Sequence, residues 1–347
     1  MSMELENLLP VGQAQTVFPP EPFHPPTLLR SANAQTLWSP IRHRTAWLCG
    51  AFRDVPTPDG DFVRLHTFLP PQEPVAAVLV LHGLEGSVES SSVQILCEGL
   101  LRRGFACHVL EFRGCGRAPL NRARRLYHSG ETTDAGLVLD LLAAEPLPLH
   151  AVGMSMGANV LGRLLAERGD TAPVRSAALI STPFVLAEAA RAVDRAAFGL
   201  YQRVFLRTLL PKALAKERQY PGCIDAERVR RCRTIVEYDN LVTAPLHGFR
   251  DADDYYTRCS CGPVLGAIRV PTLLLSSLDD PLVPAHTFPH RLAAESPWLR
   301  ALPTERGGHL GFIGRDWRAW HPDVVARFLR SADLGLSPAA IGATPNP

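Results

Sequence analysis

The chain has 347 residues, of which 46% are hydrophobic and 20% are charged, so it carries enough apolar material for a large buried core. Its formal net charge of +2 lacks the basic excess typical of nucleic-acid-binding proteins, and we expect no nucleic-acid partner. The eight cysteines contain no C-x-x-C pair, which argues against a zinc site and favours reduced thiols in a cytoplasmic protein.

The cationic side chains are almost all arginine. Lys212 and Lys216 are the only lysines among 36 cationic residues, a bias that we attribute to genome composition. No apolar run reaches about 18 residues, so we predict no membrane-spanning helix. Glu4 and Glu6 also interrupt the N-terminus, which argues against a secretion signal.

Residues 1 to about 32 are rich in proline, and residues 1–50 are predicted to form an N-terminal arm packed on the core. Within this arm, Ala32 to Pro40 is expected to form a short helix. From Ala51 to Phe68 the apolar pattern alternates around Asp59-Gly60, which predicts a β-hairpin with a tight turn.

Strand-like and helix-like segments then follow each other in alternation. Alternation of this kind predicts an α/β fold with a mostly parallel central sheet and helices on both faces. The expected strands are 75–81, 105–112, a segment that begins at 149, 174–181, 271–278 and 299–304. The expected helices are 92–103, 133–145, 158–168 and 322–330.

Roughly eighty residues separate two of these strands, which is far longer than an ordinary connection. We predict a helical cap insertion over 183–268, which divides the core into 51–182 and 269–330, and a flexible tail over 331–347. Four apolar residues of the cap recur at helical spacing and are interpreted as a stripe packed against the core rather than against lipid. They are Phe198, Tyr201, Phe205 and Leu209.

The motif G-x-S-x-G occurs at residues 153–157, between a predicted strand and a predicted helix. In this context the motif predicts a nucleophile elbow, a strained turn that exposes a serine hydroxyl. Gly153 and Gly157 remove the Cβ atoms that would clash where strand and helix come close. Ser155 is therefore the candidate nucleophile.

A serine nucleophile needs a base, and the base needs an orienting acid. In proteins with this elbow the three residues follow in the order serine, acid, histidine. Asp280 follows an apolar strand and precedes a Leu-Val-Pro run, and we favour it over its neighbour Asp279. His309 lies in a glycine-flanked loop after the last strand and is the candidate base.

Two backbone N–H groups are expected to bind the oxyanion that forms during attack. Met156 follows the nucleophile and supplies one of them. The loop at residues 82–86 (HGLEG) follows the first buried strand, and Leu84 is our choice for the second donor.

These motifs, together with several further stretches, resemble the YheT-like branch of the α/β-hydrolases, which includes the mammalian ABHD acylglycerol lipases. The resemblance covers about residues 23–329. It implies a carboxylester hydrolase with no metal and no organic cofactor, and places a catalytic triad on Ser155, Asp280 and His309. The supporting stretches are NAQTL at 33–37, FRGC at 112–115, YHSGET at 127–132, EYD at 237–239, TAP at 243–245, GF at 248–249 and DYY at 254–256. One apparent extra residue in 116–122 departs from the family pattern.

We therefore expect a serine esterase that acts on short- to medium-chain acyl esters, with monoacylglycerols as one candidate. The partner would be a small-molecule ester. An acyltransferase or thioesterase with the same triad is one alternative, and a non-catalytic lipid-binding protein is another. Apolar surface on the cap also raises peripheral membrane contact as an option. The sequence indicates no oligomeric state and no role for residues 127–132.

Overall fold

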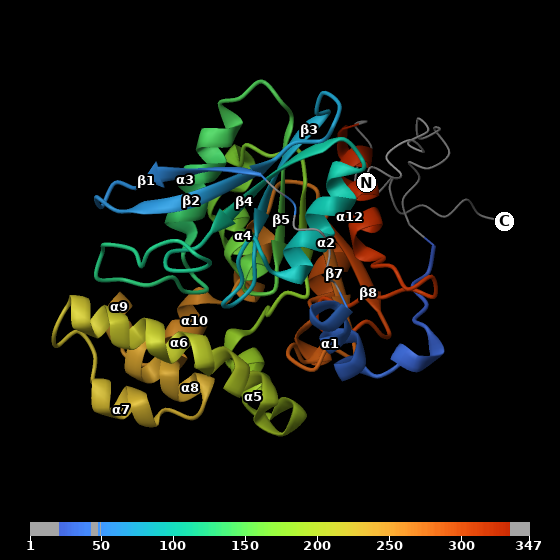
Figure 1. Cartoon of the computed structure of the whole chain (residues 1–347). Helices are drawn as coiled ribbons and strands as arrows, with labels where there is room; N and C mark the ends of the chain where they lie inside the picture. The colour runs from blue at the N-terminus through green and yellow to red at the C-terminus, as the bar shows by residue number, and fades with distance from the viewer. Residues whose placement is uncertain (1–20, 43–47, 49, 334–347) are drawn as a thin grey trace, which may run out of the picture.

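The computed structural model describes residues 21–42, 48 and 50–333. Its centre is an eight-stranded sheet with the order β1-β2-β4-β3-β5-β6-β7-β8 (Figure 1). β1 and β2 form an antiparallel hairpin, β2 pairs antiparallel with β4, and the strands from β4 onward are parallel. The strands are β1 Ala51–Pro56, β2 Phe62–Phe68, β3 Ala76–Leu81, β4 Phe105–Glu111, β5 Leu149–Met154, β6 Ala177–Ile180, β7 Thr272–Ser277 and β8 Leu299–Thr304. The predicted α/β fold with its mostly parallel sheet is confirmed.

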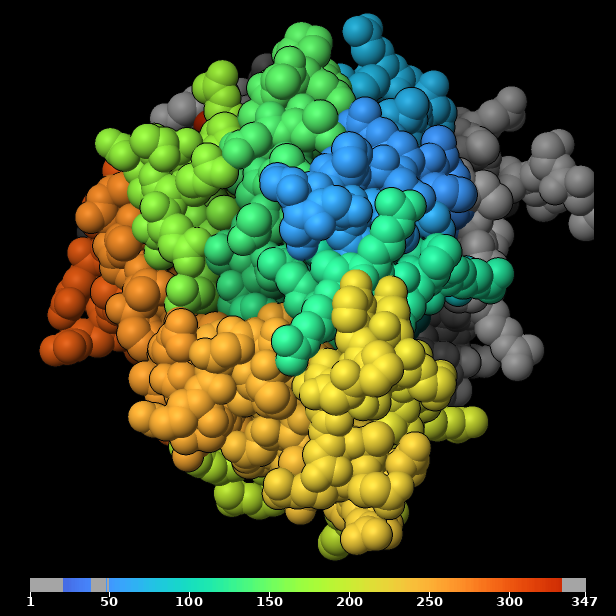
Figure 2. All heavy atoms as spheres, turned by 90° about the vertical axis from the view of Figure 1, so that its left-hand side faces the viewer, coloured from blue at the N-terminus to red at the C-terminus, as the bar shows by residue number. Residues whose placement is uncertain are grey.

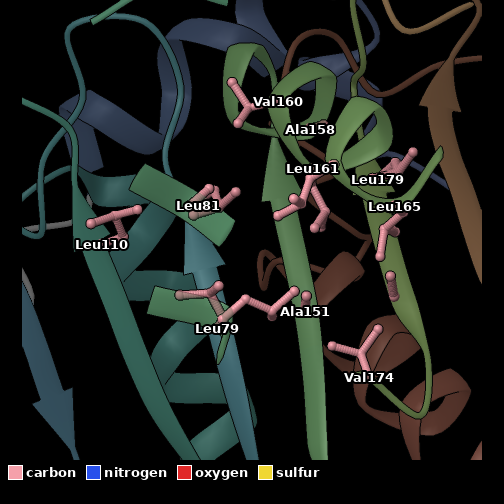
Figure 3. Packing of buried hydrophobic residues seen from close by; sticks show 14 of the residues in the cluster. Leu79, Leu81, Leu110, Ala151, Ala158, Val160, Leu161, Leu165, Val174 and Leu179 are labelled. Carbon is pink, nitrogen blue, oxygen red and sulfur yellow. The ribbon is translucent and has the colours of Figure 1, made fainter. Parts of the chain in front are cut away.

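Helices cover both faces of the sheet because side chains alternate along each buried strand. In β3, Leu79 and Leu81 pack toward one face, which is covered by α3 (Thr132–Ala143) and α4 (Met156–Arg168). Figure 3 shows this layer between sheet and helices. Val78 and Val80 pack toward the other face, which is covered by α2 (Ser91–Leu101) and α12 (His321–Asp333).

The segment between β6 and β7 is helical and has its own cluster of buried apolar residues, and we refer to it as the cap. In Figure 2 the cap, in yellow and orange, lies against the teal segment that follows β4. A π-helical turn over Asp239–Thr243 joins α8 to α9. The cap helices are α5 Leu186–Arg195, α6 Leu200–Gln219, α7 Ala226–Arg231, α8 Ile235–Tyr238, α9 Ala244–His247 and α10 Ala252–Cys259.

Two further helices lie outside the cap, α1 (Ala32–Arg42) and α11 (His290–Glu295). In the part of the chain described above, the helices are all too short or too polar to cross a bilayer. Most of the predicted arm and tail, residues 1–20, 43–47, 49 and 334–347, lies outside the described residues. The division into an arm, two core segments, a cap and a tail stays a prediction.

The predicted apolar stripe of the cap is wrong at its first residue. Phe198 precedes α6 and is 99% exposed, whereas Tyr201 and Leu209 are buried. The reason is a turn in which Ala197 and Phe198 take φ values of +46° and +55° and interrupt the helical period. Helical spacing across this turn therefore does not bring the four residues onto one face.

Candidate active site

Ser155 lies in a tight turn between β5 and α4. Its φ of +53° and ψ of −122° are strained for a residue with a side chain. A Cβ on Gly153 would lie 2.5 Å from the Cα of Ala158, and one on Gly157 would lie 2.4 Å from the carbonyl oxygen of Leu81. Glycine is therefore required on both sides of the serine, as the elbow motif predicts.

The structure brings Ser155, His309 and Asp280 into one hydrogen-bonded chain. His309 Nε2 lies 2.9 Å from Ser155 Oγ, and His309 Nδ1 lies 2.8 Å from Asp280 Oδ2. The other carboxylate oxygen accepts the N–H groups of Leu282 at 2.8 Å and Val283 at 3.1 Å. An ionised carboxylate can only accept, so the proton belongs on Nδ1, and Nε2 is left to accept from the serine hydroxyl.

Asp279, the neighbour that we did not favour, has a different position. Its Oδ1 accepts the N–H of Gly308 at 2.9 Å and the hydroxyl of Ser277. This contact fixes the backbone immediately before His309. Asp279 thus holds the loop 307–311, which carries His309 and which we call the histidine loop. Asp280 contacts the imidazole itself.

Helix α1 holds the same loop from the other side. Thr36 Oγ1 accepts the N–H of His309 at 2.9 Å. The fully buried Gln35 accepts the N–H of Ile313 at 2.8 Å and donates to the carbonyl oxygens of Ile313 and Leu29. We predicted no role for these two residues from the sequence. The NAQTL stretch that contains them could have indicated a role, because no apolar periodicity accounts for its residues.

The two predicted oxyanion donors, Leu84 and Met156, both line the cavity beside Ser155. A Cβ on Gly83 would lie 3.2 Å from the Cβ of Ser155, so the 82–86 loop packs directly against the serine. Met156 is the first residue of α4, where a backbone N–H has no partner within its own helix. The assignment of these two N–H groups as oxyanion donors stays a prediction.

His82, at the start of this loop, is a structural residue. Its Nδ1 lies 2.8 Å from the carbonyl oxygen of Gly83, and its Nε2 accepts the N–H of Phe112 at 3.2 Å. Complete burial lowers the pKa of His82 to about 4, so the ring is neutral. The neutral ring fixes the backbone from which Leu84 projects.

Glu85 follows Leu84 and is held by a buried network that we did not predict from the sequence. Its N–H donates to the Tyr127 hydroxyl at 2.8 Å, and its Oε1 accepts from that hydroxyl at 2.6 Å. Lys212 of the cap helix α6 donates to the same Oε1 at 2.6 Å. Glu85 itself has a φ of +54°, so this network holds a strained residue in place.

The two lysines of the chain could have indicated this network. The side chain of Lys216 is fully buried and donates to the carbonyl oxygens of Asn121 and Ala123, each at 2.7 Å. Lys212 and Lys216 thus both place a compact ammonium group in a buried site. The guanidinium group of arginine is wider and planar, so it would present its N–H donors in different positions. We attribute the many arginines to genome composition, and the two lysines to the buried contacts that they make.

The stretch 127–132 now has a structural account. Asn159 of α4 donates to the carbonyl oxygen of Ser129 at 2.7 Å, and the N–H of Ser129 donates to Tyr255 of the cap at 2.9 Å. Glu131 accepts the N–H groups at the start of α3. The stretch therefore connects the 82–86 loop, the helix behind the elbow and the cap.

A pocket of about 890 Å³, including its open mouth, lies between the cap and the core. Its walls are mainly apolar, with Leu186, Phe205 and Leu209 among them. Asp239 is a polar exception and accepts from the hydroxyls of Thr243 and Tyr256, each at 2.6 Å. Burial raises the pKa of Asp239 to about 6. Among the described residues no three His, Cys, Asp or Glu side chains are grouped to hold a metal ion.

Comparison with known proteins adds independent findings. Residues 76–316 match the family model described as alpha/beta hydrolase fold. The chain is 38% identical over 290 residues to YheT of Escherichia coli (strain K12), whose name proposes an esterase, and the match covers 82% of this chain and 85% of that one. It is 28% identical over 293 residues to the monoacylglycerol lipase of Saccharomyces cerevisiae, over 79% of this chain and 65% of that protein.

Solved structures show the same architecture. The esterase Pf2001 of Pyrococcus furiosus superposes with a TM-score of 0.52 at 17% identity, over 82% of this chain and 94% of that one. At this level of identity the likeness concerns the fold.

Proposed function

The chain belongs to the α/β-hydrolase family and to its YheT-like branch, and on that premise we propose that it is a serine carboxylester hydrolase that works through an acyl-enzyme. Its relatives place it among enzymes of the esterase and lipase class. The observation that carries the proposal is the hydrogen-bonded chain from Ser155 through His309 to Asp280, which opens on an apolar pocket.

In the proposed reaction, Ser155 Oγ attacks the ester carbonyl while His309 Nε2 takes its proton. Asp280 keeps the imidazole in the required tautomer and stabilises its positive charge. The tetrahedral intermediate then collapses, the C–O bond of the ester breaks, and the alcohol leaves with the proton from His309. Water, activated by the same histidine, attacks the acyl-enzyme and releases the carboxylic acid.

The N–H groups of Leu84 and Met156 are proposed to bind the oxyanion of both tetrahedral intermediates. One such donor typically contributes about two to three orders of magnitude in rate. Because both donors belong to the backbone, the Leu and Met side chains are free to face the pocket. Their apolar character suits an acyl chain.

We propose short- to medium-chain acyl esters as substrates, with monoacylglycerols as one candidate. The apolar pocket walls support an acyl chain, and the yeast relative is named a monoacylglycerol lipase. We also propose a cytoplasmic location. Seven cysteines in the described part of the chain are all free and buried, in agreement with a reducing compartment.

The test is hydrolysis of p-nitrophenyl esters from acetate to laurate, together with fluorophosphonate labelling. We compare the wild type with Ser155→Ala. Ser296→Ala is the matched control, because Ser296 does not line the pocket. Loss of both turnover and labelling only in Ser155→Ala would support the proposal. The chain-length profile would then measure the usable depth of the pocket.

Other outcomes separate the alternatives. Labelling with acyl transfer to an added alcohol in place of hydrolysis would indicate an acyltransferase, and a preference for acyl-CoA would indicate a thioesterase. Absence of labelling in a folded wild type would refute the serine mechanism and favour a lipid-binding protein.

A further inference from the structure

The turn between α5 and α6 presents a phenylalanine to solvent at a conformational cost. Ala197 and Phe198 both take the left-handed conformation, which is unfavourable for a residue that carries a side chain. Phe198 is 99% exposed, so burial within this chain does not offset that cost. Strain that displays an apolar side chain suggests contact with something outside the chain.

The first turns of α6 extend this exposed surface. Leu200 and Val204 are exposed large apolar residues, and Arg203 and Arg207 are exposed cations. Residues 200, 203, 204 and 207 share one face of an α-helix. We call this face together with Phe198 the α6 surface.

The α6 surface is cationic as well as apolar. From residue 195 to residue 210 the sequence contains three Arg and no Asp or Glu, in a chain whose formal net charge is only +2. Arg203 and Arg207 make no ion pair with a carboxylate of the described residues. Apolar side chains flanked by uncompensated arginines are the pattern of a surface that lies on an anionic membrane.

The opposite face of α6 belongs to the pocket. Phe205, Leu209 and Lys212 line the cavity that also contains Ser155. In Figure 1, α5 and the start of α6 lie next to each other at one end of the cap. The helix therefore separates the pocket from the α6 surface by a single layer of structure.

We propose that the α6 surface docks on a bilayer that contains anionic lipid, with Phe198, Leu200 and Val204 among the acyl chains and Arg203 and Arg207 at the phosphates. Docking would bring the pocket next to the leaflet, so that an apolar ester reaches it without crossing water. Binding itself depends on this surface alone and not on the proposed esterase activity.

The test is vesicle flotation of the full chain with phosphatidylcholine alone and with 30% phosphatidylglycerol added. We expect binding to the anionic vesicles that weakens as salt increases. Phe198→Ser/Val204→Ser and Arg203→Glu/Arg207→Glu should each lower the partition coefficient at least tenfold. Hydrolysis of water-soluble p-nitrophenyl acetate should stay unchanged in both double variants.

Matched controls come from exposed residues of the core. Phe52→Ser/Leu69→Ser removes two exposed apolar side chains, and Arg102→Glu/Arg291→Glu reverses two exposed arginines. Neither control should change flotation by more than twofold. Ser155→Ala should also float like the wild type, which separates docking from the proposed catalysis.

Three results would overturn the proposal. Absence of wild-type flotation on anionic vesicles is the first. Equal loss in the control and the test variants is the second, because it would indicate general electrostatic attraction. The third is wild-type self-association that Phe198→Ser/Val204→Ser abolishes without any lipid binding, because the surface would then fit a second copy of the chain.

Discussion

Replacement of Lys212 by methionine tests whether the cap controls the 82–86 loop. The change keeps an unbranched side chain and removes the ammonium that contacts Glu85. The side chains of Lys212 and Glu85 are 13% and 7% exposed, so the pair is buried. Burial alone would lower the pKa of Lys212, but Cys115 and Glu85 outweigh it and raise the pKa, so the ammonium is charged at neutral pH.

The expected loss of stability follows from the charge left behind. Removal of one partner from a buried ion pair costs roughly 3–5 kcal/mol. Glu85 keeps its bond to Tyr127, so we expect the lower end, a loss of about 3 kcal/mol in the free energy of unfolding. Urea unfolding of both proteins measures this difference.

The expected effect on activity follows from the position of Glu85 beside Leu84. Release of this strained residue should displace the Leu84 N–H and lower kcat by about tenfold to a hundredfold, below the full effect of losing one oxyanion donor. KM should change less than threefold, because the oxyanion forms only during the reaction. Affinity for a trifluoromethyl ketone, which forms a tetrahedral adduct, should fall in parallel with kcat.

Lys216 provides the matched control. It lies in the same helix and is buried, but its ammonium bonds to Asn121, Ala123 and Gln219. Lys216→Met should lose stability and leave kcat and ketone affinity within twofold of the wild type. If Lys212→Met behaves in the same way, Lys212 has only a structural role and does not position the 82–86 loop. Partial recovery of kcat in Lys212→Arg would support a requirement for the charge.

The remaining predictions concern other parts of the site. The folded-state pKa of Asp239, about 6, lies above the ordinary value of 3.8, so stability should fall by about 3 kcal/mol as the pH rises through this interval. Asp239→Asn should lack that fall in urea unfolding at pH 4 and pH 7, and an unchanged slope would contradict the assignment. Gly157→Ala places a Cβ 2.4 Å from a carbonyl oxygen of β3 and should lose about 3 kcal/mol of stability, the upper end of the usual range for overpacking, and most activity. Gly266→Ala meets only a 3.5 Å contact and should lose neither. Thr36 and Gln35 of α1 form what we call the α1 clamp on the loop that carries His309. Thr36→Val removes the acceptor of the partly buried His309 N–H and should lower kcat with little change in KM. Wild-type kinetics would refute a role of the clamp in positioning His309.

The elbow was predictable from the sequence because its requirements are local. Gly153, Ser155 and Gly157 lie within five residues, between a β-like and a helix-like pattern. The candidate base and acid, His309 and Asp280, could be chosen by chain order and by the strands that precede them. The fold was predictable for a similar reason, because buried parallel strands are continuous apolar runs.

The supporting contacts could not be predicted, because they join residues that are distant in the sequence. Lys212 and Glu85 are 127 positions apart, and neither lies in a pattern that marks the other. The turn at Ala197 and Phe198 was missed for a different reason. Its two left-handed residues are neither glycine nor asparagine, so the usual signal for such a conformation is absent.

The contact between α1 and the histidine loop also bears on how the protein is made. Gln35 and Ile313 are 278 positions apart. The ribosome therefore makes Gln35 early and must synthesise most of the chain before it reaches Ile313. The histidine loop has no clamp until that late contact closes. Partial chains should therefore carry the elbow serine without a positioned base, and cleavage of cellular esters would begin only after both halves of the clamp have been synthesised.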